Sequence, residues 1–310
     1  MIPDISVIIC TRNRLDDIKS SLEAFEKQTK PEYAEIIIVD NGSTDGTGEY
    51  LRRCQEDYRG PRLLTIFEER PGLSVARNRG LEDAVGAWVV FPDDDAVVPP
   101  TYIEQLTMGT HKYSGTYDLL GFTLKDILSG EWPEWMPPDF LDRSYPDEPG
   151  EIDLRKDWSR LNSQDIVVKR QLILDAGGFN PDLGMCGDRV HVGEESHLMR
   201  QLAENGSKAY WMGEPKVIHR LGATKGTRMH WWKRGIASGR FEALSLSKEI
   251  EAKGKIKVGL REIRVILMGI SDLVIGLVSR RLTAVDQFIL IKKLCKTWGR
   301  LSGALFDFNG

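Results

Sequence analysis

Several patterns that commonly mark a protein function are missing from this chain. Its four cysteines are far apart and form no C-x-x-C pair, which argues against a zinc site and a disulfide framework. No G-x-G-x-x-G follows the first predicted strand and no G-x-x-x-x-G-K-[ST] occurs, so the glycine loops of dinucleotide-binding and P-loop proteins are absent. The N-terminus has neither a basic segment nor an apolar segment of the signal-peptide kind. We therefore expect no signal peptide and a reducing, cytoplasmic environment.

The longest apolar stretch falls short of a membrane span. Residues 263–278 are apolar, but a helix of that length measures about 24 Å, against about 30 Å for a hydrocarbon core. Asp272 near its middle would cost about 2.5–3.5 kcal/mol inside a bilayer. Two interpretations remain: an interfacial helix beside anionic lipid, or a helix that packs on the preceding domain or a second subunit.

Charge is distributed unevenly along the chain. Residues 220–310 carry 18 Lys and Arg against 7 Asp and Glu, whereas residues 1–219 carry 24 against 39. Such a basic segment is typical of contact with an anionic partner, although it could instead pair with the acidic part of the same chain. We expect a peripheral contact with an anionic membrane surface, and no nucleic acid.

The first hundred residues alternate between strand and helix patterns. Short apolar runs predict strands at residues 5–10, 34–40, 63–67 and 87–91, and helical patterns lie between them at 15–28, 46–58 and 73–85. This alternation predicts βαβ units and a mostly parallel, Rossmann-like sheet with helices on both faces.

The second half of the chain has fewer regular patterns. We expect a long loop at residues 126–160, where tryptophans either stack on a sugar or hold the loop in place. A strand is predicted at 166–169 and a helix at 194–204, and from residue 229 onward the pattern is helical.

Three consecutive aspartates, Asp93 to Asp95, follow the apolar run at 87–92. Several carboxylates at the end of a buried strand make an oxygen-rich site suited to Mg²⁺ or Mn²⁺. Such ions commonly complete their coordination with substrate phosphates, so the cluster indicates a metal–diphosphate site and an activated donor. The alternative is a solvated turn, in which Asp is common.

Two other polar positions also lie near predicted strand ends. Asp40 ends the second strand, where it can accept hydrogen bonds from a base or a ribose. Arg77 lies near the start of the helix after the third strand, where it can serve an anionic or nucleotide partner. Because ligands of such sheets bind at the carboxyl ends of the strands, we expect these groups to share one site with the aspartates.

Together these motifs resemble the family 2 glycosyltransferases, which have the GT-A fold. The resemblance covers roughly residues 4–222 and rests on Val7-Ile-Ile-Cys-Thr-Arg-Asn13, Ile37-Ile-Val-Asp-Asn-Gly-Ser-Thr-Asp-Gly46, Ala76-Arg-Asn-Arg-Gly80, Val90-Phe-Pro-Asp-Asp-Asp95, Gly177-Gly-Phe-Asn-Pro-Asp-Leu-Gly184 and Gly193-Glu-Glu-Ser-His-Leu198. It implies a GT-A domain over residues 1–222, with a nucleotide-binding half (1–100) and an acceptor half (101–222). A helical C-terminal extension would follow at 223–310.

The resemblance also implies an inverting, metal-dependent transfer of one sugar from a nucleoside-diphosphate sugar, with a UDP-sugar favoured. By position, the nucleotide would be bound by Thr11, Arg12, Asp40, Arg77, Asp93 and Asp94. Asp93 and Asp95 match the Asp-x-Asp motif and would hold Mn²⁺ or Mg²⁺. A histidine after the base-bearing helix completes the metal shell in some relatives, which makes His219 a further candidate ligand; a structural histidine is the alternative.

An inverting transfer needs a general base for the acceptor hydroxyl. The family usually presents Glu-Asp where this chain has Glu194-Glu195, and Glu195 matches the usual Asp. Because its side chain is longer than the usual one, Glu194 remains a rival, and an acidic helix N-terminus is the structural alternative. His191 and His197 flank the pair and could touch the acceptor.

The resulting prediction is a cytoplasmic glycosyltransferase of polysaccharide biosynthesis, peripheral on the membrane, with a glycan or lipid-linked acceptor. A non-catalytic nucleotide-sugar-binding or scaffold protein is the alternative. A sugar-nucleotide pyrophosphorylase would need a Gly-x-Gly-x-Arg loop after the first strand, where this chain has Thr11-Arg-Asn-Arg14.

Overall fold

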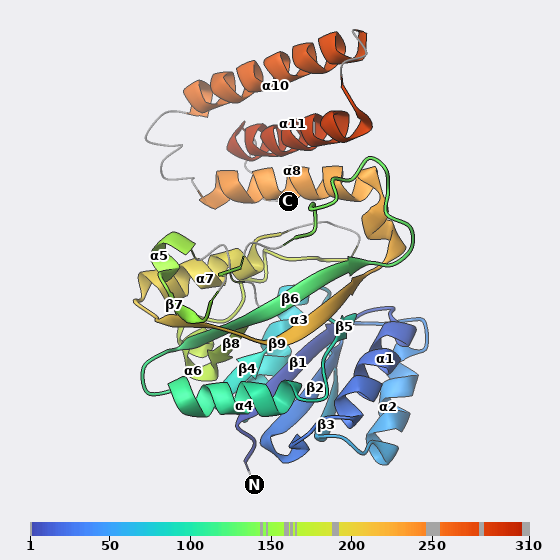
Figure 1. The fold of residues 1–310 in the computed structure, drawn as a ribbon, viewed down its shortest axis with the longest axis vertical. Helices are drawn as coiled ribbons and strands as arrows, with labels where there is room; N and C mark the ends of the chain where they lie inside the picture. The colour runs from blue at the N-terminus through green and yellow to red at the C-terminus, as the bar shows by residue number, and fades with distance from the viewer. Residues whose placement is uncertain are drawn as a thin grey trace. The chain divides into compact units, whose positions relative to one another are not determined.

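The computed structural model describes most of the chain as two compact units (Figure 1). The described residues are 2–142, 145–146, 148–157, 161, 164, 166–187, 192–245, 255–278 and 282–305. Unit 1 comprises residues 1–127, 142–187 and 194–220, and unit 2 comprises residues 128–141, 188–193 and 221–310.

Unit 1 is an α/β fold around one nine-stranded sheet. Its strands are β1 (Ile5–Thr11), β2 (Ala34–Asp40), β3 (Arg62–Phe67), β4 (Trp88–Val90), β5 (Ala96–Val97), β6 (Leu119–Leu128), β7 (Gly150–Ile152), β8 (Ile166–Lys169) and β9 (Ala209–Leu221). Its helices are α1 (Leu15–Glu26), η1 (Pro31–Tyr33), α2 (Thr47–Asp57), α3 (Leu73–Asp83), α4 (Tyr102–Tyr113), α5 (Leu154–Asp157), α6 (Arg170–Asp175) and α7 (Glu194–Glu204).

The sheet has a parallel part and an antiparallel part. The strand order is β3-β2-β1-β4-β8-β6-β9-β5, with β7 added on β9. Strands β3, β2, β1 and β4 are parallel, whereas β4–β8, β8–β6, β9–β5 and β9–β7 pair antiparallel. The carboxyl ends of β1, β2 and β4 therefore meet at one edge, which is where ligands of such sheets bind.

Helices cover both faces of the sheet. Successive strand side chains point to opposite faces, and both faces of a central strand such as β1 are apolar. In β1, Val7 and Ile9 belong to the core beneath α1, α2 and α4, whereas Ile8 belongs to the core beneath α3, α6 and α7. All three side chains are buried. The expected α/β class with a helical C-terminal segment is confirmed.

The expected long loop at 126–160 contains regular structure. β6 continues to Leu128, and β7 and α5 lie within the same stretch. The sequence did not indicate these elements because β6 begins before the stretch and β7 and α5 are short, with 3 and 4 residues. Trp135 packs on Phe288 with ring centroids 4.4 Å apart, which supports the interpretation that tryptophan holds this segment in place.

Unit 2 is mainly helical. It contains η4 (Ala223–Gly226), α8 (Arg228–Ser245), α10 (Lys255–Val278) and α11 (Ala284–Leu305). Glycines allow α8 and α11 to approach closely, since a Cβ on Gly239 would overlap the Lys296 carbonyl oxygen and one on Gly299 would overlap that of Ile236. Among the described helices, none is both long and apolar enough for a membrane span.

Candidate functional site

The end of β1 lies directly beside the end of β2. Thr11 and Asp40 are the last residues of these strands and are register partners in the parallel pair. Both side chains are buried, whereas Arg12, one residue further along, is exposed. Asp40 Oδ1 accepts a hydrogen bond from the Ser43 amide at 2.9 Å. Three of the residues predicted to bind a nucleotide therefore lie together at this edge.

Gly48 of α2 lies close to the Asp40 carboxylate. A Cβ at position 48 would stand 2.6 Å from Asp40 Oδ2, so only glycine fits without a shift. The absence of a side chain at Gly48 thus lets the first turn of α2 approach the Asp40 carboxylate closely.

Asp93, Asp95 and His219 converge on one point. The three aspartates occupy the turn between β4 and β5, which is closed by a hydrogen bond from the Ala96 amide to the Asp93 carbonyl at 3.1 Å. His219 arrives from β9, because β9 pairs with β5 and places His219 opposite Ala96. Its Nε2 lies 2.9 Å from Asp95 Oδ1 and 3.3 Å from Asp93 Oδ2. One ligand atom from each residue lies within 4.8 Å of the other two.

Asp126 contacts the second ring nitrogen of His219. Asp126 Oδ1 of β6 lies 2.6 Å from His219 Nδ1. Burial disfavours the imidazolium, but the carboxylates of Asp126, Asp93 and Asp95 outweigh it and raise the pKa of His219 to about 11. A carboxylate behind a histidine is a common arrangement for orienting a metal ligand. Two carboxylates and an imidazole are donors that Mn²⁺ accepts, so the residues present fit a divalent cation.

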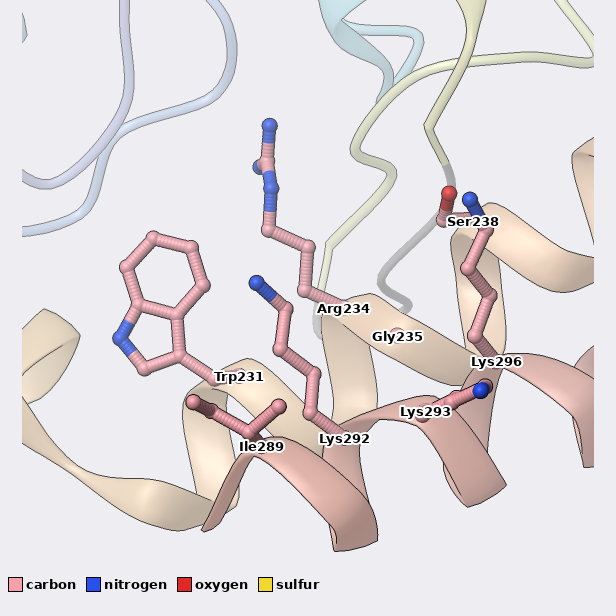
Figure 2. Close-up of a pocket in the computed structure, with 8 residues that line it drawn as sticks. All are labelled: Trp231, Arg234, Gly235, Ser238, Ile289, Lys292, Lys293 and Lys296. Carbon is pink, nitrogen blue, oxygen red and sulfur yellow. The ribbon is translucent and has the colours of Figure 1, made fainter. Parts of the chain in front are cut away.

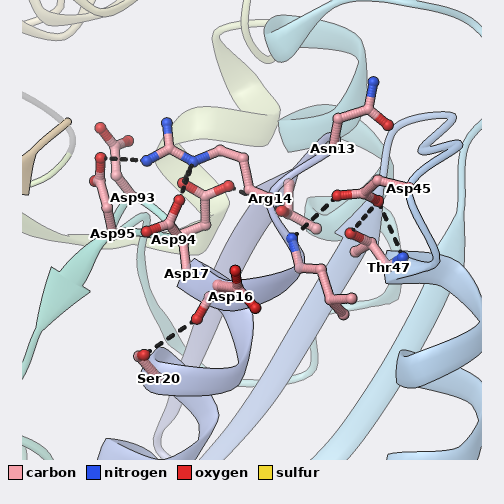
Figure 3. A network of polar contacts seen from close by, with 12 residues as sticks. Asn13, Arg14, Asp16, Asp17, Ser20, Asp45, Thr47, Asp93, Asp94 and Asp95 are labelled. Carbon is pink, nitrogen blue, oxygen red and sulfur yellow. Dashed lines mark hydrogen bonds and ion pairs between the residues drawn. The ribbon is translucent and has the colours of Figure 1, made fainter. Parts of the chain in front are cut away.

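Asp94, the middle aspartate, faces a different group of residues. Its carboxylate accepts a hydrogen bond from Thr11 Oγ1 at 2.8 Å and lies 3.1 Å from Arg14 Nε. Arg14 also reaches Asp95 Oδ2 at 2.7 Å, so its guanidinium bridges two of the three aspartates (Figure 3). Burial raises the pKa of Asp94 to about 7, although Arg14 acts in the opposite direction.

The acid pair begins α7 and is joined to Arg77 of α3. Arg77 lies 3.3 Å from Glu194 Oε1 and 2.9 Å from Glu195 Oε1. Burial opposes its charge, but Glu195 and Glu194 hold the pKa of Arg77 above its ordinary value. The Glu195 side chain is 18% exposed and that of Glu194 is 11% exposed. Arg77, expected in the nucleotide pocket, thus contacts the candidate bases.

Three residues at the site were not anticipated from the sequence. Asp126 holds His219, Arg14 bridges the aspartates, and the side-chain amide of Gln164 donates a hydrogen bond to Asp93. Arg14 ends a polar stretch that the sequence did reveal, whereas Asp126 and Gln164 had no local signal. Of the two flanking histidines, His197 is half-buried on α7, and His191 lies outside the described residues.

Residues 6–135 match the family model described as glycosyl transferase family 2. This chain carries a family 2 glycosyltransferase domain. The matched segment runs from β1 past the aspartate cluster and includes Asp126. The resemblance inferred from the sequence motifs is therefore confirmed over this segment.

Two curated relatives come from Haloferax volcanii. The chain is 28% identical over 222 residues to a glucosyl-dolichyl phosphate glucuronosyltransferase, covering 70% of this chain and 69% of the relative. It is 38% identical over 194 residues to glycosyltransferase AglE, covering 61% of this chain and 60% of that protein. The chain thus aligns with less than two thirds of AglE.

Solved structures share the GT-A fold of this chain. The mannosyltransferase PcManGT from Pyrobaculum calidifontis, in complex with GDP-Man and Mn²⁺, has a TM-score of 0.57 at 23% identity, covering 81% of this chain and 65% of that one. Residues 1–349 of S. aureus TarS, in complex with UDP, have a TM-score of 0.56 at 16% identity, covering 96% and 90%. At these identities the likeness concerns the fold alone.

Proposed function

We propose that this glycosyltransferase moves one sugar from a nucleoside-diphosphate sugar, with a UDP-sugar favoured, to a glycan or lipid-linked acceptor, with inversion. The convergence of Asp93, Asp95 and His219 at the carboxyl edge of the sheet carries the proposal. The complexes of the similar structures with UDP and with GDP-Man and Mn²⁺ support this type of donor. The relative named for a glucosyl-dolichyl phosphate supports a lipid-linked acceptor.

In this proposal Asp93, Asp95 and His219 hold Mn²⁺ or Mg²⁺. When bound, such an ion neutralises charge on the leaving diphosphate as a Lewis acid. Asp126 fixes the orientation of the His219 ring through Nδ1.

The nucleotide is bound beside the metal residues. Asp40 accepts hydrogen bonds from the base or ribose, with Thr11 and Arg12 beside it at the end of β1. Asp93 would lie near the ribose and the metal, with Asp94 as a hydrogen-bond partner. Thr11 links the two groups because it donates to Asp94. Arg77, which also pairs with Glu194 and Glu195, is the remaining residue assigned to nucleotide binding.

Glu195 takes the proton of the acceptor hydroxyl. Its side chain is the more exposed of the pair, which suits a group that must reach an acceptor. Glu194 remains the rival. Both carboxylates are positioned by Arg77, which is itself buried against the ring of Phe179 at 5.2 Å.

The proposed setting is polysaccharide biosynthesis on the cytoplasmic face of the membrane, with a catalytic domain at residues 1–222 and a helical extension at 223–310. All four cysteines are free, as suits a reducing compartment. On α10, Ile263, Leu267 and Ile270 are exposed at helical spacing, which suits a helix lying at a membrane surface.

A flotation assay with anionic vesicles tests the membrane contact. Leu267→Glu should reduce vesicle binding, whereas Met108→Glu, at an exposed apolar position of α4, should leave it unchanged. Equal binding by the two variants would count against a membrane role for α10 and favour a second subunit.

Thermal-shift titration with UDP, GDP, dTDP and CDP tests the donor site. We expect one diphosphate to raise the melting temperature in Mn²⁺, with the shift lost in EDTA and in Asp95→Asn. No shift with any of the four would contradict the proposed donor class.

A further inference from the structure

A second cluster of charged side chains lies in unit 2, between α8 and α11. A pocket of about 410 Å³ opens there, within the usual range of ~300–1,000 Å³ for small-molecule sites. Cationic side chains line it from both helices, namely Arg234 from α8 and Lys292, Lys293 and Lys296 from α11. Figure 2 shows Arg234 and Lys292 extending from neighbouring helices in the same direction.

Glu242 of α8 and Glu262 of α10 are already engaged in ion pairs. Glu242 pairs with Lys296 and Arg300, and Arg300 also pairs with Glu262 at 3.1 Å. Within the described part of the chain, no carboxylate lies within 4.0 Å of Arg234, Lys292 or Lys293. Among the described residues, these three cations therefore share one pocket without a carboxylate counter-ion.

The packing of the two helices holds these cations together. A Cβ on Gly235 would lie 3.2 Å from the Lys292 carbonyl oxygen, and one on Gly239 would overlap that of Lys296. Burial, together with the charges of Arg234 and Lys296, lowers the pKa of Lys292. A bound anion would relieve this repulsion.

The pocket also offers an apolar wall. The indole of Trp231 lines it and is fixed by a hydrogen bond from Nε1 to the Lys225 carbonyl at 2.6 Å. Ile289 lines it as well and is half exposed. Lys292 Nζ lies over the Trp231 ring, 5.3 Å from its centroid. The cation and the aromatic surface therefore adjoin.

We propose that the pocket between α8 and α11 binds the phosphate or diphosphate group of a lipid-linked acceptor, with Arg234, Lys292 and Lys293 on the anion and Trp231 and Ile289 along the first carbons of the chain. Guanidinium and ammonium groups are the usual partners of phosphate oxygens. The choice of a lipid-linked ligand rests on the proposed function, whereas the anion site rests on the pocket alone.

Binding of farnesyl diphosphate, measured by calorimetry in EDTA, tests the inference. EDTA keeps any metal-dependent diphosphate binding at the donor site out of the measurement. We expect Arg234→Gln and Lys292→Gln to weaken binding by about tenfold or more, the loss typical of a charge-assisted hydrogen bond. Lys233→Gln is the matched control, because Lys233 neighbours Arg234 on α8, is exposed and does not line the pocket.

Separate ligands distinguish the sources of the anion. Inorganic diphosphate should bind more weakly than farnesyl diphosphate, and phosphatidylglycerol vesicles should not displace the latter. Equal losses in the Lys233 and pocket variants, equal binding of inorganic diphosphate, or displacement by vesicles would each overturn the assignment. Failure of the proposed function would instead appear as missing Mn²⁺-dependent nucleotide binding, which this assay does not involve.

Discussion

Arg77 of α3 and Glu195 of α7 form an ion pair of 2.9 Å inside unit 1, although the two residues are 118 positions apart in the sequence. The same guanidinium lies 3.3 Å from Glu194, so one buried cation positions both candidate bases. This arrangement gives the two glutamates similar surroundings, and kinetics must separate their roles.

The first prediction concerns the general base. Glu195→Gln should lower the transfer rate by about 10²–10⁴-fold, because the amide cannot accept the acceptor proton. Nucleoside-diphosphate binding, measured by thermal shift, should stay unchanged. Glu194→Gln is the matched variant and should lose less activity. A larger loss in the Glu194 variant would assign the base to Glu194.

The second prediction concerns the residue behind the proposed metal ligand. Asp126→Asn should weaken Mn²⁺ binding by about 10–100-fold, because Asp126 orients the His219 ring. Free Mn²⁺ can be followed by electron paramagnetic resonance. Asp153→Asn, at an exposed position, should bind Mn²⁺ as the unchanged protein does. Unaltered binding by the Asp126 variant would exclude an orienting role for this carboxylate.

The third prediction concerns helix packing in unit 2. Gly239→Ala should lower the free energy of unfolding by about 1–3 kcal/mol, since the added methyl would overlap the Lys296 carbonyl oxygen. Denaturant unfolding measures the change. Gly222→Ala serves as the control because a Cβ there meets nothing within 4 Å and its φ is −59°. Equal stabilities of the two variants would show that α8 and α11 can separate without cost.

The fourth prediction concerns pH. Burial, with Arg234 and Lys225 nearby, lowers the pKa of His230 to about 4 from an ordinary value of 6.5. As pH falls below 6.5, the unfolded chain binds a proton at this histidine that the folded protein does not, so stability should fall until about pH 4.

Urea unfolding at pH 7 and pH 5 measures this effect. The difference between the two free energies of unfolding should be smaller in His230→Gln than in the unchanged protein. An identical pH dependence would mean that His230 titrates alike in both states.

The strands and polar turns of the nucleotide-binding half could be predicted from the sequence. Apolar runs such as Ile5–Thr11 and Ala34–Asp40 bury both faces of a parallel strand, so their signal is local. Because parallel strands align their carboxyl ends, the sequence also indicated that Asp40 and the aspartates at 93–95 share one edge. The acid pair likewise starts the helix that was expected at 194–204.

Tertiary structure alone decided which residues complete these groups. His219 reaches Asp95 because β9 pairs antiparallel with β5, and Asp126 reaches His219 from β6, whose presence the sequence did not reveal. Arg77 faces the acid pair because α3 and α7 cover the same face of the sheet. The cations of α8 and α11 gather because glycines let the two helices approach. Local periodicity determines each element, whereas contacts between distant elements depend on strand order and side-chain packing.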